Sequence, residues 1–269
     1  MRQTREATVY SFNGVEDGVP LDMPQAFESI ACSERVAVQF DLLNAQELEH
    51  WWGDDGFPRT PERGHNHAPL TIASPTLGPL QRASEEDYSA KLASYFAYAK
   101  LANRDLRRTR FVRLFIDELG AEAYQIGEWG ELLMATRRLF LENRDTEYSF
   151  EPHVDAINFG VNPGTWLIKK DYEQISALLT ISGASNHAGI VFWDKRPKHR
   201  VELNSWIKEY RETGRIRAIE HVATFTATPS AGQLLLFSSR YLHAVEACLS
   251  QRRTLGTFLV WEEGWRLCH

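Results

Sequence analysis

The sequence predicts a mostly β protein, an antiparallel double-sheet jelly roll supported by helices in its N-terminal half. From residue 148 onward, short β-rich segments separated by turn residues follow one another, as is typical of a sandwich or barrel. Helical periodicity is concentrated before that point. Because no repeat or linker divides the chain, we expect one domain over residues 1–269, with helix-rich support and lid loops in 1–147 and the jelly-roll core in 148–269.

The N-terminal half contains the predicted helices. Residues 36–40 predict a strand that leads into a helix capped by Asn44. Residues 54–79 are rich in proline, glycine and polar residues and predict a long surface excursion, a kind of segment that often serves as a lid or binding loop. Apolar residues three or four apart predict helical structure over 85–119 and a second helix over 131–142.

The C-terminal half contains most of the predicted strands. One stretch, LNSWIKEYRE at 203–212, has a helical pattern and interrupts them. The segments that we expect to be strands are 148–160, 165–170, 175–182, 189–194, 220–229, 232–239 and 254–261.

Composition excludes several functions. The hydrophobic fraction of 43% is ample for a packed core, and the net charge of −6 gives no reason to expect binding to nucleic acid or to an anionic membrane. The basic run RDLRRTRFVR at 104–113 is interpreted as a solvated helix face. The three cysteines are widely spaced, and the sequence has neither an apolar signal core nor an apolar run long enough to span a membrane. We therefore expect a soluble, cytoplasmic protein. The sequence does not predict its oligomeric state.

Three residues form a candidate metal site. His153 and Asp155 are two apart in an expected strand, so their side chains point to the same face. His243 follows the apolar strand at 233–237 and a short polar bend that turns the chain inward. Two histidines and one carboxylate can occupy one face of an iron(II) octahedron and leave positions open for a co-substrate and dioxygen. The alternative is a polar strand end at His153 and an unrelated surface histidine at His243.

An arginine further along the chain supports the metal-site interpretation over the structural alternative. Arg253 lies ten residues beyond His243, on a strand expected to return beside the metal, and its planar fork can bind a dicarboxylate bidentately. Thr257 lies four residues on, on the same strand face, and can donate a hydrogen bond to that carboxylate. Arg252 would point to the opposite face unless a bulge reverses the alternation.

This ordered set resembles the iron(II)/2-oxoglutarate-dependent dioxygenase superfamily over roughly Val36 to Trp261. The motifs that carry the resemblance are HVD, ISALLTIS, AGIVFWD, AGQLLLFSSRYLHAV and RRTLGTF. The resemblance implies a double-stranded β-helix, a form of jelly roll. It also implies iron(II) held by His153, Asp155 and His243, 2-oxoglutarate that chelates the metal and is clamped by Arg253, and dioxygen as co-substrate.

The implied reaction is hydroxylation of an unactivated C–H bond. Related radical halogenases carry glycine or alanine where this chain has Asp155, so halogenation is not expected, whereas desaturation and ring formation stay open. The compact chain favours a small molecule, and analogy within the superfamily favours a free or N-acylated amino acid. The alternatives are the same chemistry on a protein or nucleic acid, and a non-catalytic cupin-like binding module.

The expected substrate contacts are Arg82, Trp193, Arg240 and the loop that contains His65 and His67. Two of these have a simpler interpretation. The two histidines are typical of a surface loop, and Trp193 is more typical of a core aromatic than of a substrate wall.

Overall fold

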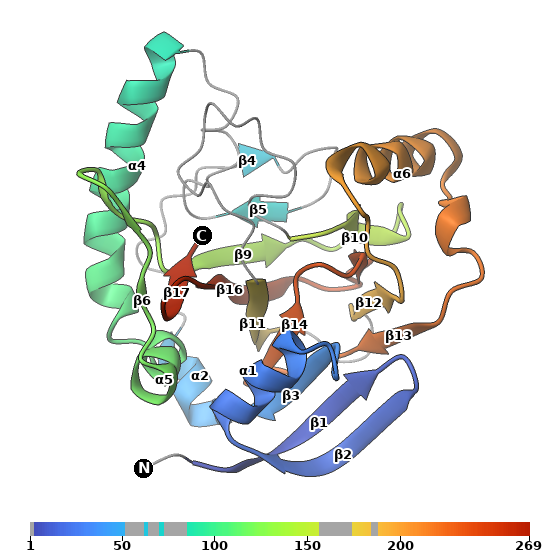
Figure 1. Ribbon diagram of the computed structural model, residues 1–269, viewed down its shortest axis with the longest axis horizontal. Coiled ribbons are helices and arrows are strands. Elements are labelled where there is room, and N and C mark those ends of the chain that lie inside the picture. The colour runs from blue at the N-terminus through green and yellow to red at the C-terminus, as the bar shows by residue number, and fades with distance from the viewer. Residues whose placement is uncertain (1–2, 52–61, 64–69, 73–84, 156–173, 184–187) are drawn as a thin grey trace.

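The computed structural model describes residues 3–51, 62–63, 70–72, 85–155, 174–183 and 188–269, and within them two largely antiparallel sheets face each other (Figure 1). The large sheet has the order β2 (Gly14–Leu21), β1 (Arg5–Ser11), β3 (Ala37–Asp41), β14 (Gln233–Ser238), β11 (Gln174–Ser182), β16 (Arg252–Trp261), β9 (Thr136–Phe140), β5 (Leu70–Ile72) and β4 (Glu62–Arg63). A further strand, β17 (Trp265–Cys268), pairs with β16 and runs parallel to β6 (Glu122–Ala123).

The second sheet carries the strands nearest the candidate metal site. Its order is β10 (Tyr148–His153), β15 (His243–Glu246), β12 (Ile190–Trp193) and β13 (Thr224–Ala227), and every neighbouring pair is antiparallel. A small separate hairpin joins β7 (Gln125–Ile126) to β8 (Gly130–Glu131).

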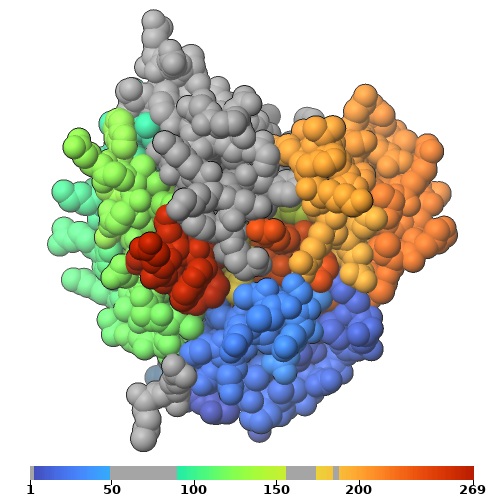
Figure 2. All heavy atoms as spheres, viewed as in Figure 1, coloured from blue at the N-terminus to red at the C-terminus, as the bar shows by residue number. Residues whose placement is uncertain are grey.

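The helices of the described residues lie mostly before the second sheet. They are α1 (Met23–Ala31), α2 (Ala45–Trp51), α4 (Glu85–Leu106), α5 (Arg110–Leu119) and α6 (Arg200–Thr213), followed by a 3₁₀ turn at Arg217–Ile219. None of those described is both long enough and apolar enough to cross a bilayer. In the space-filling view, the C-terminal residues (red) border the green segment around α5 and the N-terminal segment (blue), whereas the residues around α6 (orange) lie on the opposite side (Figure 2).

Most predicted elements are confirmed, together with the local chemistry that begins them. Asn44 accepts a hydrogen bond from the backbone N–H of Glu47 at 3.0 Å, and the Glu47 carboxylate accepts one from the N–H of Asn44 at 2.8 Å, which is a capping box. The helical region expected at 85–119 is two helices, because Thr109 caps a new one by accepting the N–H of Val112. The predicted helix at 203–212 lies within α6.

The helix predicted over 131–142 is wrong. Thr136 to Phe140 form β9, which pairs with β16 on one side and with β5 on the other, while Leu132 to Ala135 are all buried. A run in which every residue is buried has no solvent-facing helical stripe. The hydrogen bonds of two neighbouring strands therefore outweigh a weak helical propensity here.

Several elements were not predicted. The hairpin β1–β2 and helix α1 have no counterpart in the sequence interpretation, and the excursion expected over 54–79 contains the short strands β4 and β5. The rest of that excursion lies outside the described residues, as does the strand expected at 165–170.

The central strands of the large sheet, β14, β11 and β16, are buried on both faces, and this decides where polar groups can lie. On one face, side chains such as Leu179, Leu236 and Leu255 pack with residues of α1, α4 and α5 in the largest apolar cluster. On the other face, Leu178 and Leu235 pack with residues of the second sheet. The cavity described below opens on this second face.

Gly232 provides a test of backbone strain at the start of β14. Its φ is +89°, and a Cβ there would lie 2.1 Å from the carbonyl oxygen of Leu43. We expect Gly232→Ala to lower the free energy of unfolding by about 3 kcal/mol, because a steric clash adds to left-handed strain. In the control Gly18→Ala, where φ is +70° and no atom lies within 4 Å of the added Cβ, only the strain of about 1 kcal/mol applies. Equal losses in urea denaturation would show that the Leu43 contact does not matter.

Candidate active site

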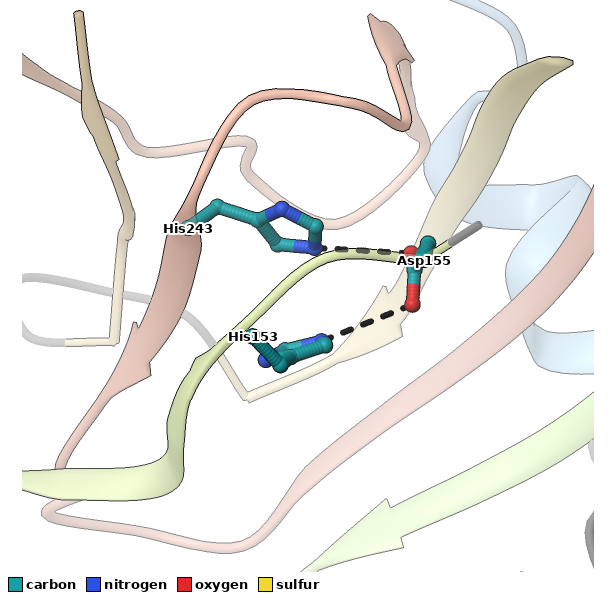
Figure 3. Close-up of side chains that lie close together, drawn as sticks. All are labelled: His153, Asp155 and His243. Carbon is teal, nitrogen blue, oxygen red and sulfur yellow. Dashed lines mark ion pairs between the residues drawn. The ribbon is translucent and has the colours of Figure 1, made fainter. Parts of the chain in front are cut away.

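Three ligand-type side chains converge where β10 and β15 meet (Figure 3). His153 is the last residue of β10 and His243 the first of β15, and the two are directly opposite each other in the antiparallel register. Opposite residues of an antiparallel pair point to the same face. Asp155 lies two residues beyond the end of β10, where its backbone N–H donates to the carbonyl of Ser239 at 3.0 Å.

The carboxylate of Asp155 lies between the two imidazoles. Nε2 of His153 is 3.4 Å from Oδ1 of Asp155, and Nε2 of His243 is 3.4 Å from Oδ2 (Figure 3). One ligand atom from each of the three residues lies within 4.8 Å of the others. Such spacing suits three donors that share one metal ion.

Both imidazoles are oriented by their own strands. Nδ1 of His153 lies 2.8 Å from the carbonyl oxygen of Glu151, and Nδ1 of His243 lies 2.8 Å from that of Tyr241. A carbonyl oxygen only accepts, so Nδ1 carries a proton and Nε2 is the ring atom that faces Asp155. When Nε2 of both rings is unprotonated, two lone pairs and a carboxylate meet there, an arrangement that a bound cation stabilises.

Hydroxyl and amide groups of the large sheet fix the carboxylate. Ser176, on β11, donates to Oδ2 of Asp155 at 3.0 Å, and its hydroxyl lies 2.8 Å from that of Ser239. The side-chain amide of Gln174 donates to the backbone carbonyl of Asp155. These contacts hold the aspartate in one orientation although it lies outside any strand.

Electrostatics favours the protonation states that a metal requires. Burial tends to raise the pKa of Asp155, but the two facing imidazoles outweigh it and hold that pKa well below its usual range. Burial, together with the neighbouring His243, lowers the pKa of His153. The site thus offers an ionised carboxylate and neutral imidazole at neutral pH, as metal ligation needs.

A cavity of about 350 Å³ opens beside the three residues. Its wall is mainly apolar, from side chains such as Phe140, Phe150, Leu178, Ile207 and Phe258. Among the described residues, the charged side chains that line it besides Asp155 are all arginines, namely Arg138, Arg200 and Arg252. A pocket of this size and character is typical of small-molecule sites.

Arg252 is a buried cation in this wall. It is 0% exposed, its Nη1 donates to the carbonyl of Ala188 at 2.5 Å, and its Nη2 lies 3.5 Å from the hydroxyl oxygen of Thr180. In the described part of the chain, its Nε and the buried hydroxyl of Thr254 have no hydrogen-bond partner. Burial lowers the pKa of Arg252 to about 10, so the guanidinium stays charged near neutral pH.

The prediction that Arg253 and Thr257 share the strand face of β16 that points to the site, with Arg252 on the opposite face, is wrong. Arg252 lines the cavity, whereas Arg253 is not among the lining residues and is partly exposed. Thr257 borders the cavity, but its hydroxyl donates to the carbonyl of Met134 at 2.5 Å. Thr254 shares the alternation of Arg252, with its hydroxyl unpaired. The irregularity between Thr180 and Ser182 on the neighbouring strand adds to the ambiguity of phase at this end of β16.

Two of the expected substrate contacts, Trp193 and Arg240, do not line the cavity. Trp193 packs with Leu203 and Trp206 beneath α6 and is not a lining residue of the cavity, which supports its interpretation as a core aromatic. Arg240 does not line the cavity either. Arg82, His65 and His67 lie outside the described residues.

Two lining arginines were missed. Arg138 falls in the stretch that was expected to be a helix, and Arg200 begins α6. The available signal for Arg138 was a basic residue that closely follows the apolar run at 132–135. That signal does not place Arg138 at the cavity, because its position there depends on the pairing of β9 with β16.

Comparison with known proteins gives one strong likeness. No family model matches the chain, and no curated protein matches it in sequence. Among solved structures, an N-substituted L-amino acid dioxygenase from Burkholderia ambifaria AMMD is 38% identical, with each chain covered in full and a TM-score of 0.84. The same enzyme in complex with α-ketoglutarate, which is 2-oxoglutarate, superposes with a TM-score of 0.82.

An identity of 38% over the whole of both chains goes well beyond a shared fold. The two histidines and the aspartate that converge beside the cavity match the donor set of non-haem iron oxygenases. The chain belongs to the iron(II)- and 2-oxoglutarate-dependent dioxygenases.

Proposed function

We propose that this dioxygenase hydroxylates a C–H bond of an N-substituted amino acid. The observation that carries the proposal is the convergence of His153, Asp155 and His243 on one wall of a small, mainly apolar cavity. Iron(II), 2-oxoglutarate and dioxygen together supply the oxidant, while 2-oxoglutarate is converted to succinate and carbon dioxide. The relative at 38% identity acts on N-substituted L-amino acids, which supports the substrate class.

In this proposal the three residues hold the iron. His153 and His243 present Nε2 lone pairs, and Asp155 supplies the charge that offsets part of the metal's charge. Ser176 keeps the carboxylate in place. The protein thereby fixes one face of the metal and leaves the cavity side for the other ligands.

Arg252 is assigned to the far carboxylate of 2-oxoglutarate, in place of Arg253. It is buried, charged and without a carboxylate partner among the described residues, and its Nε is unpaired. A guanidinium with free donors suits a carboxylate. Thr254 lies two residues on and also has an unpaired buried hydroxyl, but it does not line the cavity, so the assignment rests on Arg252 alone.

The cavity favours a small molecule over the alternatives. The basic run at 104–113 spans the end of α4, the turn after it and the start of α5. Its residues Arg104, Arg108 and Arg110 are exposed, and it contributes no residue to the cavity wall. A nucleic-acid substrate would need that charge around the site. A buried arginine facing the metal residues has no evident use in a non-catalytic cupin-like module.

The architecture and the cysteines support three further proposals. Strands β9, β16, β11 and β14 face β10, β15, β12 and β13, and we assign these eight to the double-stranded β-helix. The largest apolar cluster joins residues of α1, α4 and α5 to β11, β14 and β16, which supports a single domain over 1–269. Three unpaired cysteines, Cys32, Cys248 and Cys268, support the cytoplasmic location.

The substrate class is tested by a product screen. Free amino acids and their N-acetyl and N-succinyl derivatives are incubated with the protein, iron(II), ascorbate and 2-oxoglutarate. We expect succinate to form in proportion to a product that is 16 mass units heavier for N-acylated members, with little turnover of the free acids. Substrate-independent succinate formation across the whole panel would contradict the proposed class.

Replacing a ligand tests the metal role. We expect His243→Ala to weaken iron(II) binding by at least about a hundredfold and to remove substrate-coupled succinate formation, because even outer-shell changes cost ten- to a hundredfold. His221→Ala, at an exposed histidine outside the cavity, is the control and leaves both unchanged. Iron content and succinate are measured on protein with an unaltered circular dichroism spectrum. Normal iron content and turnover in His243→Ala would refute the assignment.

The neighbouring arginines test the co-substrate role. We expect Arg252→Ala to raise the dissociation constant of 2-oxoglutarate about tenfold to a thousandfold, because a buried carboxylate loses its charged partner. Arg253→Ala is the matched control on the other strand face, with a change below about threefold. Calorimetry with iron(II) under anaerobic conditions measures both. A larger effect of Arg253→Ala than of Arg252→Ala would contradict the assignment of Arg252 and support Arg253 as the residue that binds 2-oxoglutarate.

A further inference from the structure

Arg138 is a second cation of the cavity wall, half-buried on β9, and the roles assigned above leave it unused. It lies on β9, and its Cζ is 3.6 Å from the position that a Cβ on Gly256 would take. The guanidinium therefore lies across β16 at a point where a glycine leaves room for it. Arg252 and Gly256 share one face of that strand, so both cations border the same space.

His269 holds one edge of this guanidinium. Its Nε2 is 3.0 Å from Nη2 of Arg138, and a guanidinium only donates, so the imidazole must accept and is neutral. Burial and the adjacent Arg138 hold the pKa of His269 well below its usual range, in agreement with a neutral ring.

Three contacts keep the imidazole of His269 in place. Its ring stacks on Phe258, with centroids 5.2 Å apart and planes 6° apart, and its backbone carbonyl accepts from the hydroxyl of Tyr95 at 2.5 Å. The third is the bond to Arg138 itself. Phe258 also lines the cavity, so His269 stands directly behind the wall and fixes the guanidinium plane.

The charges of the cavity leave room for one more anion. No described carboxylate forms an ion pair with Arg138 or Arg252, and Asp155 is taken up by the metal in the proposed function. Arg200, the third lining arginine, is exposed, so solvent screens its charge. A divalent metal, Asp155, Arg138 and Arg252 sum to three positive charges. The dianion 2-oxoglutarate offsets two of them. Because a charge that is partly removed from water is costly without a partner, the remaining one calls for a carboxylate from another molecule.

We propose that Arg138, positioned by His269, is a second carboxylate-binding site of the cavity, and that it binds the carboxylate of the amino-acid-derived substrate. This inference rests on the iron and co-substrate roles proposed above. The C1 carboxylate of 2-oxoglutarate offers the same chemistry beside the metal, so the experiment must separate the two sources.

The test compares an acid with its amide. The affinities of N-acetyl-L-leucine and N-acetyl-L-leucinamide are measured by anaerobic calorimetry on the protein loaded with iron(II) and 2-oxoglutarate. We expect the wild type to prefer the acid by at least about tenfold, as for a buried charge pair. Arg138→Met removes this preference and Arg138→Lys retains part of it, while the affinity for 2-oxoglutarate stays within about twofold.

The His269 variants test positioning. His269→Phe keeps the stacking on Phe258 but offers no acceptor to Arg138, so we expect it to lose much of the preference for the acid. His269→Gln restores an acceptor and part of the preference, which a purely structural role would not predict. A wild-type preference in His269→Phe would overturn the positioning role.

The remaining outcomes decide which molecule supplies the carboxylate that Arg138 binds, and whether Arg138 binds one at all. If Arg138→Met instead weakens 2-oxoglutarate about tenfold and keeps the preference for the acid, the site binds the C1 carboxylate and the substrate assignment is overturned. If neither affinity changes, or if the wild type shows no preference, the second carboxylate site itself is refuted. Succinate formation coupled to substrate oxidation in Arg138→Met would then show that the proposed function stands without it.

Discussion

The register between β10 and β15 is the constraint on which the site depends. His153 and His243 meet because they are directly opposite each other in that antiparallel pair, and a slip of one residue would turn one ring to the other face. The hydrogen bond from the backbone N–H of Asp155 to the carbonyl of Ser239 holds the aspartate beside the two imidazoles, although Asp155 belongs to no strand. The cavity, the protonation states and the spacing of the ligand atoms all follow from this pairing.

The sequence was sufficient for the elements whose signals are local. The strand at β3, the capping box at Asn44 and helix α6 follow from alternation, capping chemistry and periodicity. It was insufficient where tertiary pairing decides. Residues 132–140 contain good helix formers, yet β16 and β5 flank β9, and the hairpin β1–β2 acquires its place only by pairing with β3. A single sequence contains no direct signal of these partners.

The sequence singled out the three residues of the candidate metal site but not their neighbours, for a physical reason. A histidine and a carboxylate two apart, followed by one histidine after a buried strand, carry their chemistry in residue type and spacing. The choice between Arg252 and Arg253 depends on strand phase. On a strand with both faces buried, hydrophobic alternation disappears, because Leu255 packs toward the helices while Gly256 borders the cavity. Polar residues on such a strand therefore give no clue to their direction.

Burial on both faces also separates stability from binding. The apolar cluster under α1, α4 and α5 stabilises the large sheet from one side, which leaves polar groups free to line the other. Of the buried polar atoms without a described partner, Nε of Arg252 belongs to the cavity wall, the hydroxyl of Thr254 shares its strand face, and Nδ1 of His269 stands behind it. Unpaired buried groups cost free energy in the empty protein. Any cavity ligand that supplies an acceptor to Nε of Arg252 regains part of that cost on binding, so carboxylates are favoured over neutral molecules of the same shape.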